Sequence, residues 1–148
     1  MSTTATRSFE FDAAHRVLGH TGKCRFLHGH RYRVEVTVKA KELDDLGMVV
    51  DFSCIKEKLQ PWIDEHWDHN VLLNENDPLF DLKPSDQLTV FGDKEPLVFA
   101  DNPTAEIIAE QFGLVAQRAF TPLSLSVVGV RIYETPNCWA DWSPSCSS

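Results

Sequence analysis

A stretch of alternating residues that begins with two closely spaced histidines constrains the fold of this chain more than any other feature. Every second residue from Tyr32 to Val38 is aromatic or a valine, and polar or charged residues lie between them. A period of two is typical of a β-strand with one buried face. Extending the alternation backwards places His28 and His30 on that buried face. Two imidazoles therefore point to the same side of the predicted sheet.

A third histidine ends an earlier stretch with the same period. Phe9, Phe11, Ala13 and His15 occupy alternate positions, which predicts a neighbouring strand with His15 on its inner face. Three neutral imidazoles that converge on a sheet face form an open zinc site, with the fourth position left for water or a substrate. The candidate zinc ligands are therefore His15, His28 and His30.

The rest of the pattern predicts two helices and further strands. Ser53 is a candidate N-cap for a helix that ends near His66, and Pro61 should kink or divide this helix. A second helix is expected from about 103–104 to 120. The expected strands cover residues 7–14, 29–40, 125–134 and 138–142. A polar insertion at 75–102 contains two short apolar runs that suggest a hairpin.

The length of 148 residues predicts one domain over residues 1–148. Two pairs of strands flank a pair of helices, with the insertion between the helices. Such an order is typical of an α+β fold in which two helices pack on one face of a four-stranded antiparallel sheet.

Composition excludes several classes of partner. A net charge of −8 and a pI of about 5.1 argue against nucleic acid or an anionic membrane. The N-terminus lacks the apolar core of a signal peptide, and no stretch reaches membrane-spanning length. The cysteines at 24, 54, 138 and 146 form no C-x-x-C pair, so a reduced, cytoplasmic protein is expected.

Basic residues are concentrated near the candidate zinc ligands. The segment 16–33 contains no acidic residue but five basic ones, namely Arg16, Lys23, Arg25, Arg31 and Arg33. A basic segment beside a metal site suits a phosphorylated small molecule. For Arg31 and Arg33 a solvated strand face is an equally good interpretation, because they should point away from the site.

Cys24 allows two interpretations. It precedes His28 by four residues and could be a fourth ligand that closes a structural zinc site. It also lies in a loop between Lys23 and Arg25, whose charges favour the thiolate, the form that acts as a base or nucleophile. We expect a catalytic thiol beside the zinc rather than a ligand.

Two further positions carry candidate acid–base groups. Asp68 and His69 are adjacent, and a carboxylate-supported imidazole can carry protons near neutral pH, although the pair could also be an ordinary helix terminus. Glu134 ends an apolar strand, where a carboxylate can accept two parallel hydrogen bonds from an amidine-like edge such as that of a pterin. A solvated strand end is the alternative for Glu134.

Six motifs together resemble one known family, the 6-pyruvoyl-tetrahydropterin synthases and 6-carboxy-tetrahydropterin synthases. In chain order they are FDAAH (11–15), CRFLHGH (24–30), GMVVDF (47–52), DHNVLLN (68–74), PTAEIIA (103–109) and YETPNC (133–138). The three-residue gap between Cys24 and His28 resembles the bacterial 6-carboxy-tetrahydropterin synthases of queuosine biosynthesis. The insertion and the residues after Glu134 depart from the family pattern.

The resemblance implies a tunnelling fold (T-fold) and a zinc-dependent lyase. By this resemblance the three histidines bind Zn²⁺, Cys24 accepts a proton, Asp68 and His69 form a relay, and Glu134 holds the pterin. Thr104 and Glu106 match positions that line the pterin pocket. The implied substrate is dihydroneopterin triphosphate, whose triphosphate would leave past Arg16, Lys23 or Arg25.

The same resemblance implies a homo-oligomer, commonly a hexamer, with active sites at subunit interfaces. The expected reaction releases acetaldehyde and triphosphate and forms 6-carboxy-tetrahydropterin. Alternatives are the pyruvoyl-forming reaction, a cupin-type metal module and a non-catalytic zinc-binding domain. The cupin alternative rests on the H-x-H-x₄-E spacing of His28, His30 and Glu35.

Overall fold

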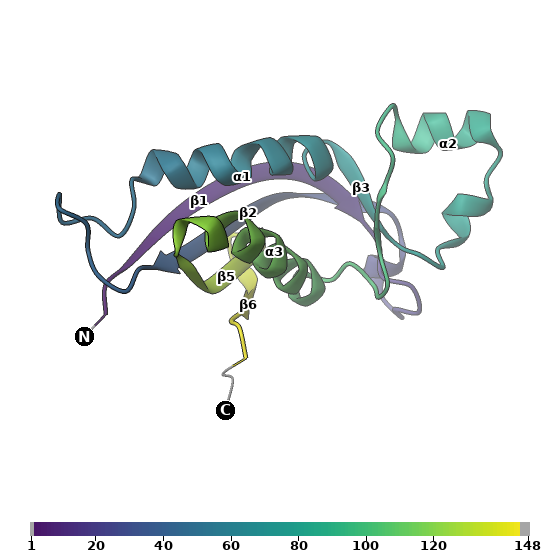
Figure 1. The fold of residues 1–148 in the computed structure, drawn as a ribbon. Coiled ribbons are helices and arrows are strands. Elements are labelled where there is room, and N and C mark those ends of the chain that lie inside the picture. Colours follow the sequence, from purple (N-terminus) through teal and green to yellow (C-terminus); the bar gives the residue numbers. More distant parts are fainter. Residues whose placement is uncertain (1, 146–148) are drawn as a thin grey trace.

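The computed structural model describes residues 2–145, and in this part of the chain six strands form one sheet in the order β4-β3-β1-β2-β5-β6 (Figure 1). The strands are β1 (Thr4–His15), β2 (His28–Lys39), β3 (Asn70–Asn74), β4 (Leu97–Phe99), β5 (Ser126–Thr135) and β6 (Cys138–Trp142). The helices are α1 (Phe52–His66), α2 (Pro84–Phe91) and α3 (Ala105–Phe120). The α+β class expected from the sequence is confirmed.

The two histidine-bearing strands form the antiparallel centre of the sheet. In the register of β1 and β2, His15 lies opposite His28 and Ala13 opposite His30. The alternate residues of both strands are buried, as their period predicts. The strand pairing therefore brings all three imidazoles to one end of one face.

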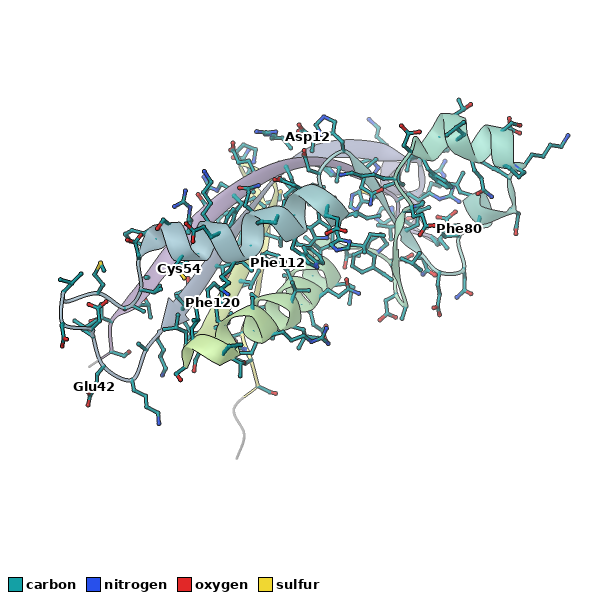
Figure 2. The ribbon with its side chains drawn as sticks, turned by 45° about the horizontal axis from the view of Figure 1, so that its top comes forward. Asp12, Glu42, Cys54, Phe80, Phe112 and Phe120 are labelled. Atoms are coloured by element: carbon teal, nitrogen blue, oxygen red, sulfur yellow. The ribbon has the colours of Figure 1, made fainter. Side chains whose placement is uncertain are left out.

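Helices α1 and α3 cover the buried face of this sheet. Ile55, Leu59 and Ile63 of α1 belong to the same hydrophobic core as Phe112 and Phe120 of α3. Figure 2 shows these two phenylalanines in the layer between the helices and the sheet. The prediction of two helices on one face is confirmed for α1 and α3.

The sheet is larger and less uniform than predicted. The expected sheet had four antiparallel strands, whereas β3 pairs parallel with β1 and β4 pairs parallel with β3. Strand β3 was not recognisable from a period of two because four of its five residues are buried in succession. Strands that are buried on both faces lack alternation.

The predicted hairpin within the insertion is wrong. Residues 84–91 form helix α2, which begins at Pro84, a favoured first position of a helix. Gly92 ends α2 with a φ of 70°, and its N–H donates to the carbonyl of Leu88, so the residue expected in a hairpin turn is a helix terminator. Phe91 packs with Val71 and Leu73 in a second small core.

Helix α1 differs from the prediction at two positions. Asp51, not Ser53, is the N-cap, because its carboxylate accepts hydrogen bonds from the Ser53 N–H at 2.8 Å and the Ser53 hydroxyl at 2.7 Å. Pro61 does not divide the helix, which continues to His66. The buried stripe of α1 packs against the sheet on both sides of the proline and maintains the helix.

Candidate active site

Three imidazoles converge where β1 meets β2. The possible ligand atoms of His15, His28 and His30 all lie within 4.8 Å of one another. The ring centroids of His15 and His28 are 4.7 Å apart, and those of His28 and His30 are 4.9 Å apart. Only 2% of His15 is exposed, so the cluster lies at the edge of the core.

The hydrogen bonds of this cluster fix the tautomers of two rings. His15 Nδ1 lies 2.7 Å from the carbonyl of Pro103, and His28 Nδ1 lies 2.7 Å from the carbonyl of Phe26. A carbonyl only accepts, so both Nδ1 atoms carry the proton and donate it. In the neutral rings each Nε2 atom then carries a lone pair and no proton. The Nε2 atoms of His15 and His28 nevertheless face each other at 3.1 Å.

Two facing lone pairs repel each other unless a metal ion or a proton lies between them. His30 Nε2 is also buried and has no hydrogen-bond partner within residues 2–145. Metal-binding histidines usually donate the N–H of their other ring nitrogen to a carbonyl or carboxylate, as His15 and His28 do here. The three Nε2 atoms therefore fit a divalent metal. Together His15, His28 and His30 supply three imidazole nitrogens and leave further coordination positions open.

The ionisation of the cluster agrees with metal binding. Burial lowers the pKa of His15 and of His30 below the ordinary imidazole value, against the raising effects of the Pro103 hydrogen bond on His15 and the Glu134 charge on both rings. Neutral imidazole is the form that binds a metal. The lowered pKa values of His15 and His30 therefore favour the metal-binding form of these two rings.

Glu134 and Tyr32 border the imidazoles. Glu134 Oε1 lies 3.7 Å from His15 Nε2, and 29% of the glutamate side chain is exposed. The buried Tyr32 ring lies 5.4 Å from the His30 ring, and burial raises the pKa of its phenol. Sequence reasoning placed Tyr32 in the core only; its position two residues after His30 on the same strand face was the available signal.

Cys24 lies beside the cluster in sequence but is not part of it. In the described residues, the His, Cys, Asp and Glu groups with ligand atoms within 4.8 Å of one another do not include Cys24. The cysteine lies in the short 3₁₀ segment Lys23–Arg25 and is half-buried. Arg25 Nη1 donates to the carbonyls of Thr21 and Gly22 and so braces this loop.

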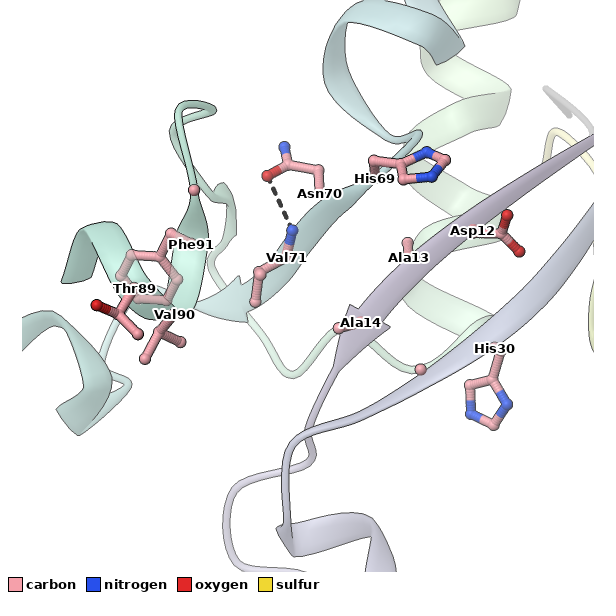
Figure 3. A pocket seen from close by; sticks show the side chains of 12 residues that line it. Asp12, Ala13, Ala14, His30, His69, Asn70, Val71, Thr89, Val90 and Phe91 are labelled. Carbon is pink, nitrogen blue, oxygen red and sulfur yellow. Dashed lines mark hydrogen bonds between the residues drawn. The ribbon is translucent and has the colours of Figure 1, made fainter. Parts of the chain in front are cut away.

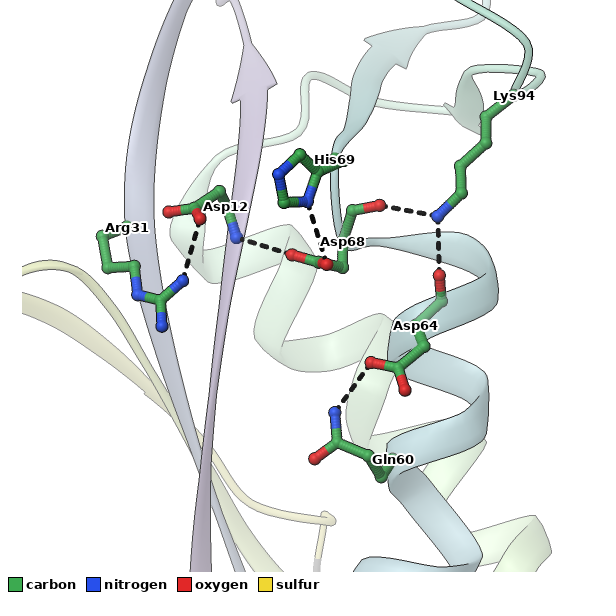
Figure 4. Close-up of polar contacts among 7 residues, drawn as sticks. All are labelled: Asp12, Arg31, Gln60, Asp64, Asp68, His69 and Lys94. Atoms are coloured by element: carbon green, nitrogen blue, oxygen red, sulfur yellow. Dashed lines mark hydrogen bonds and ion pairs between the residues drawn. The ribbon is translucent and has the colours of Figure 1, made fainter.

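The adjacent Asp68 and His69 form a hydrogen-bonded pair (Figure 4). His69 Nδ1 lies 2.9 Å from Asp68 Oδ2, and the other carboxylate oxygen accepts the Asp12 N–H at 3.0 Å. The His69 N–H donates to the Asp12 carbonyl at 2.6 Å. Two backbone groups of Asp12 therefore fasten the pair to β1, a role for Asp12 that sequence reasoning missed although the residue lies within the FDAAH motif.

Local electrostatics keep the Asp68 carboxylate charged. Burial alone would raise its pKa, but the Asp12 N–H, the His69 hydrogen bond and the nearby Lys94 charge outweigh burial, so the pKa of Asp68 lies below its ordinary value. A charged Asp68 holds the proton on His69 Nδ1 and leaves Nε2 to exchange protons. The His69 side chain is 75% exposed, so this nitrogen is open to an approaching group.

A cavity of about 680 Å³ adjoins the pair (Figure 3). Its lining comes from β1, the start of β2, the start of β3 and the C-terminal end of α2. Asp12 and His30 lie on one side of this cavity, and Thr89, Val90 and Phe91 lie on the other. The His30 ring points away from His69, so the imidazole cluster and the pair are presented in different directions.

Comparison with known proteins shows the family of the chain. Residues 4–145 match the family of 6-pyruvoyl tetrahydropterin synthase. The chain belongs to this family. Members of the tetrahydropterin synthase family are enzymes, and the match spans every element from β1 to β6.

Curated relatives carry the name of one branch of this family. The 6-carboxy-5,6,7,8-tetrahydropterin synthase of Rickettsia bellii is 39% identical over 137 residues, covering 92% of this chain and 96% of the relative. A probable 6-carboxy-5,6,7,8-tetrahydropterin synthase of Halobacterium salinarum is 33% identical over 133 residues, covering 88% and 79%. The chain is therefore similar to this branch along nearly its whole length.

Solved structures show the same fold. An uncharacterized protein from Wolinella succinogenes superposes with a TM-score of 0.82 at 26% identity, covering 98% of this chain and 99% of that one. The 6-pyruvoyl tetrahydropterin synthase of Caenorhabditis elegans superposes with a TM-score of 0.68 at 23% identity, covering 98% and 97%. The expected T-fold is thereby confirmed.

The residues expected to line a pterin pocket lie at the start of α3. The Thr104 hydroxyl caps α3 by accepting the Ile107 N–H at 3.3 Å, and Glu106 is exposed in the first turn. Pro103, one residue earlier, provides the carbonyl that binds His15. The His15 hydrogen bond thus fixes the turn 103–106 next to the imidazole cluster.

Arg16 forms an ion pair with a residue of the insertion. Its guanidinium forms a two-pronged ion pair with the buried carboxylate of Asp77, with Nε 2.7 Å from Oδ2. Asp77 lies in the insertion, so Arg16 fastens the insertion to the end of β1. This ion pair engages Nε and Nη2, so the remaining N–H groups of the guanidinium are those left for another partner.

The cupin alternative fails on the position of Glu35. Its carboxylate pairs with Arg33 at 3.0 Å, and it belongs to neither ligand group of the described residues. Membership of the tetrahydropterin synthase family also replaces the cupin interpretation. As for membranes, none of the helices within residues 2–145 is both long and apolar enough to cross one.

Proposed function

We propose that this protein is a zinc-dependent 6-carboxy-tetrahydropterin synthase that converts dihydroneopterin triphosphate and one water to 6-carboxy-tetrahydropterin, acetaldehyde and triphosphate. The curated relatives at 33–39% identity support this branch over the pyruvoyl-forming one. The observation that carries the proposal is the convergence of three imidazole Nε2 atoms beside the Glu134 carboxylate.

The metal would be held by His15, His28 and His30. When bound there, zinc supplies Lewis acidity towards oxygens of the substrate side chain, which makes the adjacent C–H more acidic. The chain contributes the tautomers, since the Pro103 and Phe26 carbonyls orient the two rings before a ligand arrives.

The remaining groups would bind the ring and move protons. Glu134 would accept two parallel hydrogen bonds from the amidine-like edge of the pterin and so orient it. The Cys24 thiolate would remove the proton from the activated C–H, and His69 would exchange protons at Nε2 while Asp68 holds its Nδ1–H. Thr104 and Glu106 would line the ring pocket from the start of α3.

A complete site would require two copies of the chain. The His30 ring points away from His69. His69 of one copy would therefore serve the imidazole cluster of a neighbouring copy in a homo-oligomer, for which the T-fold hexamer is the expected assembly.

The triphosphate would leave past Lys23 and Arg25. Both flank Cys24 on the same loop, so their charges lie close to the proposed reacting group. We leave Arg16 out of this group because Asp77 occupies its guanidinium.

Incubation of the zinc-loaded protein with dihydroneopterin triphosphate, followed by mass analysis, tests the proposal. The expected products are 6-carboxy-tetrahydropterin and acetaldehyde in equal amounts. Pyruvoyl-tetrahydropterin without acetaldehyde would assign the chain to the other branch. Unchanged substrate, with zinc bound at one ion per chain, would contradict the proposed activity.

A further inference from the structure

Lys94 joins the insertion to the turn that carries the proposed proton relay. Its ammonium Nζ donates to the Asp64 carbonyl and to the Asp68 carbonyl, each at 2.6 Å (Figure 4). Asp64 lies in the last turn of α1, and Asp68 directly precedes His69. One charged group therefore bridges the end of the helix and the start of the relay.

The two carbonyls need such a donor because the end of α1 is irregular. The Asp68 N–H, which a continued helix would donate to the Asp64 carbonyl, donates instead to Ile63 at 2.8 Å. Carbonyls at a helix C-terminus lack partners within the helix and attract cations through the helix dipole. Lys94 supplies both the hydrogen bonds and the positive charge.

The backbone of His69 also needs support. Its φ of 54° lies in the left-handed region, which a residue with a Cβ adopts at a cost in free energy. The surrounding contacts hold this conformation, namely the 2.6 Å hydrogen bond from the His69 N–H to Asp12 and the Lys94 bond on the preceding carbonyl.

A neighbouring contact fastens the same two segments. Asn70 Nδ2 donates to the Glu95 carbonyl at 3.1 Å and to the His66 carbonyl at 2.7 Å. Residues 94–95 of the insertion are thus joined to the turn on both sides of His69. This second contact should preserve the docking of the insertion when the Lys94 side chain is changed.

We propose that Lys94 is a positioning residue, which fixes the direction of the His69 imidazole by holding the Asp68 carbonyl. The inference rests on the proposed function, in which His69 exchanges protons with the substrate. It gives the insertion a role in that reaction, because the insertion delivers the ammonium that orients the relay.

The test compares Lys94→Met with Lys94→Arg and with Lys83→Met. Methionine keeps the apolar stem but removes the ammonium, whereas arginine retains a cation that can donate to both carbonyls. Lys83 is an exposed lysine at the start of α2, so it is the matched control within the same insertion. If Lys94→Met fails to fold, Lys94→Gln takes its place.

Two readouts separate positioning from structure. We expect Lys94→Met to lower kcat by about tenfold or more and to change KM by less than about twofold. The fall in kcat is smaller than the full contribution of an acid–base group, because His69 is still present but less well oriented. Zinc content should be unchanged, and Lys94→Arg should recover most of the loss. The histidine ring signal of His69, assigned by its loss in His69→Gln, should move in the NMR spectrum of Lys94→Met and not in that of Lys83→Met.

Three outcomes would overturn the inference. The first is a Lys94→Met enzyme with the kcat of Lys83→Met and an unmoved His69 signal. The second is a loss of zinc and a rise in KM together with the fall in kcat, which indicates a general structural role. If the wild-type protein makes no pterin product, the proposed function fails and only the His69 signal tests the role of Lys94. A shift of that signal in Lys94→Met then supports positioning by Lys94. An unmoved signal is the third contrary outcome.

Discussion

The Nε2 atoms of His15 and His28 face each other at 3.1 Å, although both rings use their Nδ1–H to donate a hydrogen bond to a carbonyl and so carry no proton on Nε2. Such a contact is unfavourable between two lone pairs and favourable around a shared cation. At the scale of single residues, this contact and the orphaned His30 nitrogen are the reason to place a metal here.

Removal of any one imidazole should weaken metal binding. Alanine at His15, His28 or His30 should lower zinc affinity by roughly a hundredfold or more, because loss of a group that only orients a ligand already costs about 10–100-fold. Competition with a fluorescent chelator measures this change. His20→Ala is the control, since His20 is exposed and its Nδ1 accepts the Gly22 N–H. Equal zinc affinity in all four variants would show that the cluster does not bind the ion.

Cys24 should be required for turnover but not for zinc. Cys24→Ala should bind one zinc per chain and lose about 10²–10⁴-fold in kcat, as expected for a missing acid–base group. Metal analysis and the product assay check both parts. Cys54→Ala, in the first turn of α1, is the matched control and should retain activity. Loss of zinc in the Cys24 variant would instead support the structural zinc domain.

The metal-free protein should lose stability between neutral and mildly acidic pH. The pKa values of His15 and His30 are lowered in the fold, so the unfolded chain binds more protons as the pH falls through about 6.5. Their neutral forms therefore stabilise the fold above that pH, and this contribution is lost as the pH falls toward the folded pKa values. Chemical denaturation at several pH values measures the effect.

His30→Gln gives the matched comparison for this pH effect. Its free energy of unfolding should depend less on pH between 7.5 and 5.5 than that of the wild type, a window chosen as about one unit on each side of the ordinary imidazole pKa. His20→Gln should keep the wild-type dependence. The same slope in all three proteins would contradict the lowered pKa values.

At the scale of elements, α3 and β6 meet at a glycine. A Cβ on Gly113 would lie 2.2 Å from the Trp142 ring, so the close packing of helix against strand needs the missing side chain. Gly113→Ala should lower the free energy of unfolding by about 1–3 kcal/mol through overpacking. Gly129→Ala, whose Cβ would meet only the Trp142 carbonyl at 3.6 Å, is the control and should be tolerated. If Gly113→Ala has the same free energy of unfolding as the wild type, the Trp142 ring moves aside without cost, which would contradict this prediction.

The sequence predicted those elements whose pattern is local. Alternation identified β1 and β2, and apolar residues at helical spacing identified α3. Strand β3 escaped because burial on both faces removes alternation, and α2 escaped because Gly92, which ends it, lies in the turn-like segment 92–95 that favoured a hairpin. These errors follow from tertiary packing, which a local pattern does not contain.

In the candidate site, too, the features recognisable from the sequence were local ones. The histidines, Cys24 and the Asp68–His69 pair were recognisable from residue type, spacing and motif order. The groups that orient them were not, because Pro103 and Lys94 lie far away in sequence from the residues they bind. The Asp77 partner of Arg16 was likewise not recognisable, because it lies 61 residues away in the sequence.

At the scale of the whole molecule, the account requires two copies to complete one site. A mixture of Cys24→Ala and His69→Gln chains, refolded together, should therefore regain activity. Random assembly leaves about a quarter of the sites with both native groups, so about a quarter of the wild-type kcat is expected. Each variant refolded alone is the control. No recovery in mixed oligomers would show that both groups act within one chain.

The central claim is that three imidazoles bind the metal and leave a position open to the substrate. X-ray absorption at the zinc edge of the loaded protein tests it most directly. The account predicts nitrogen neighbours at about 2.0–2.1 Å from three histidines with oxygen in the remaining position, and the same spectrum for Cys24→Ala. A sulfur neighbour at about 2.3 Å that disappears in Cys24→Ala would contradict it.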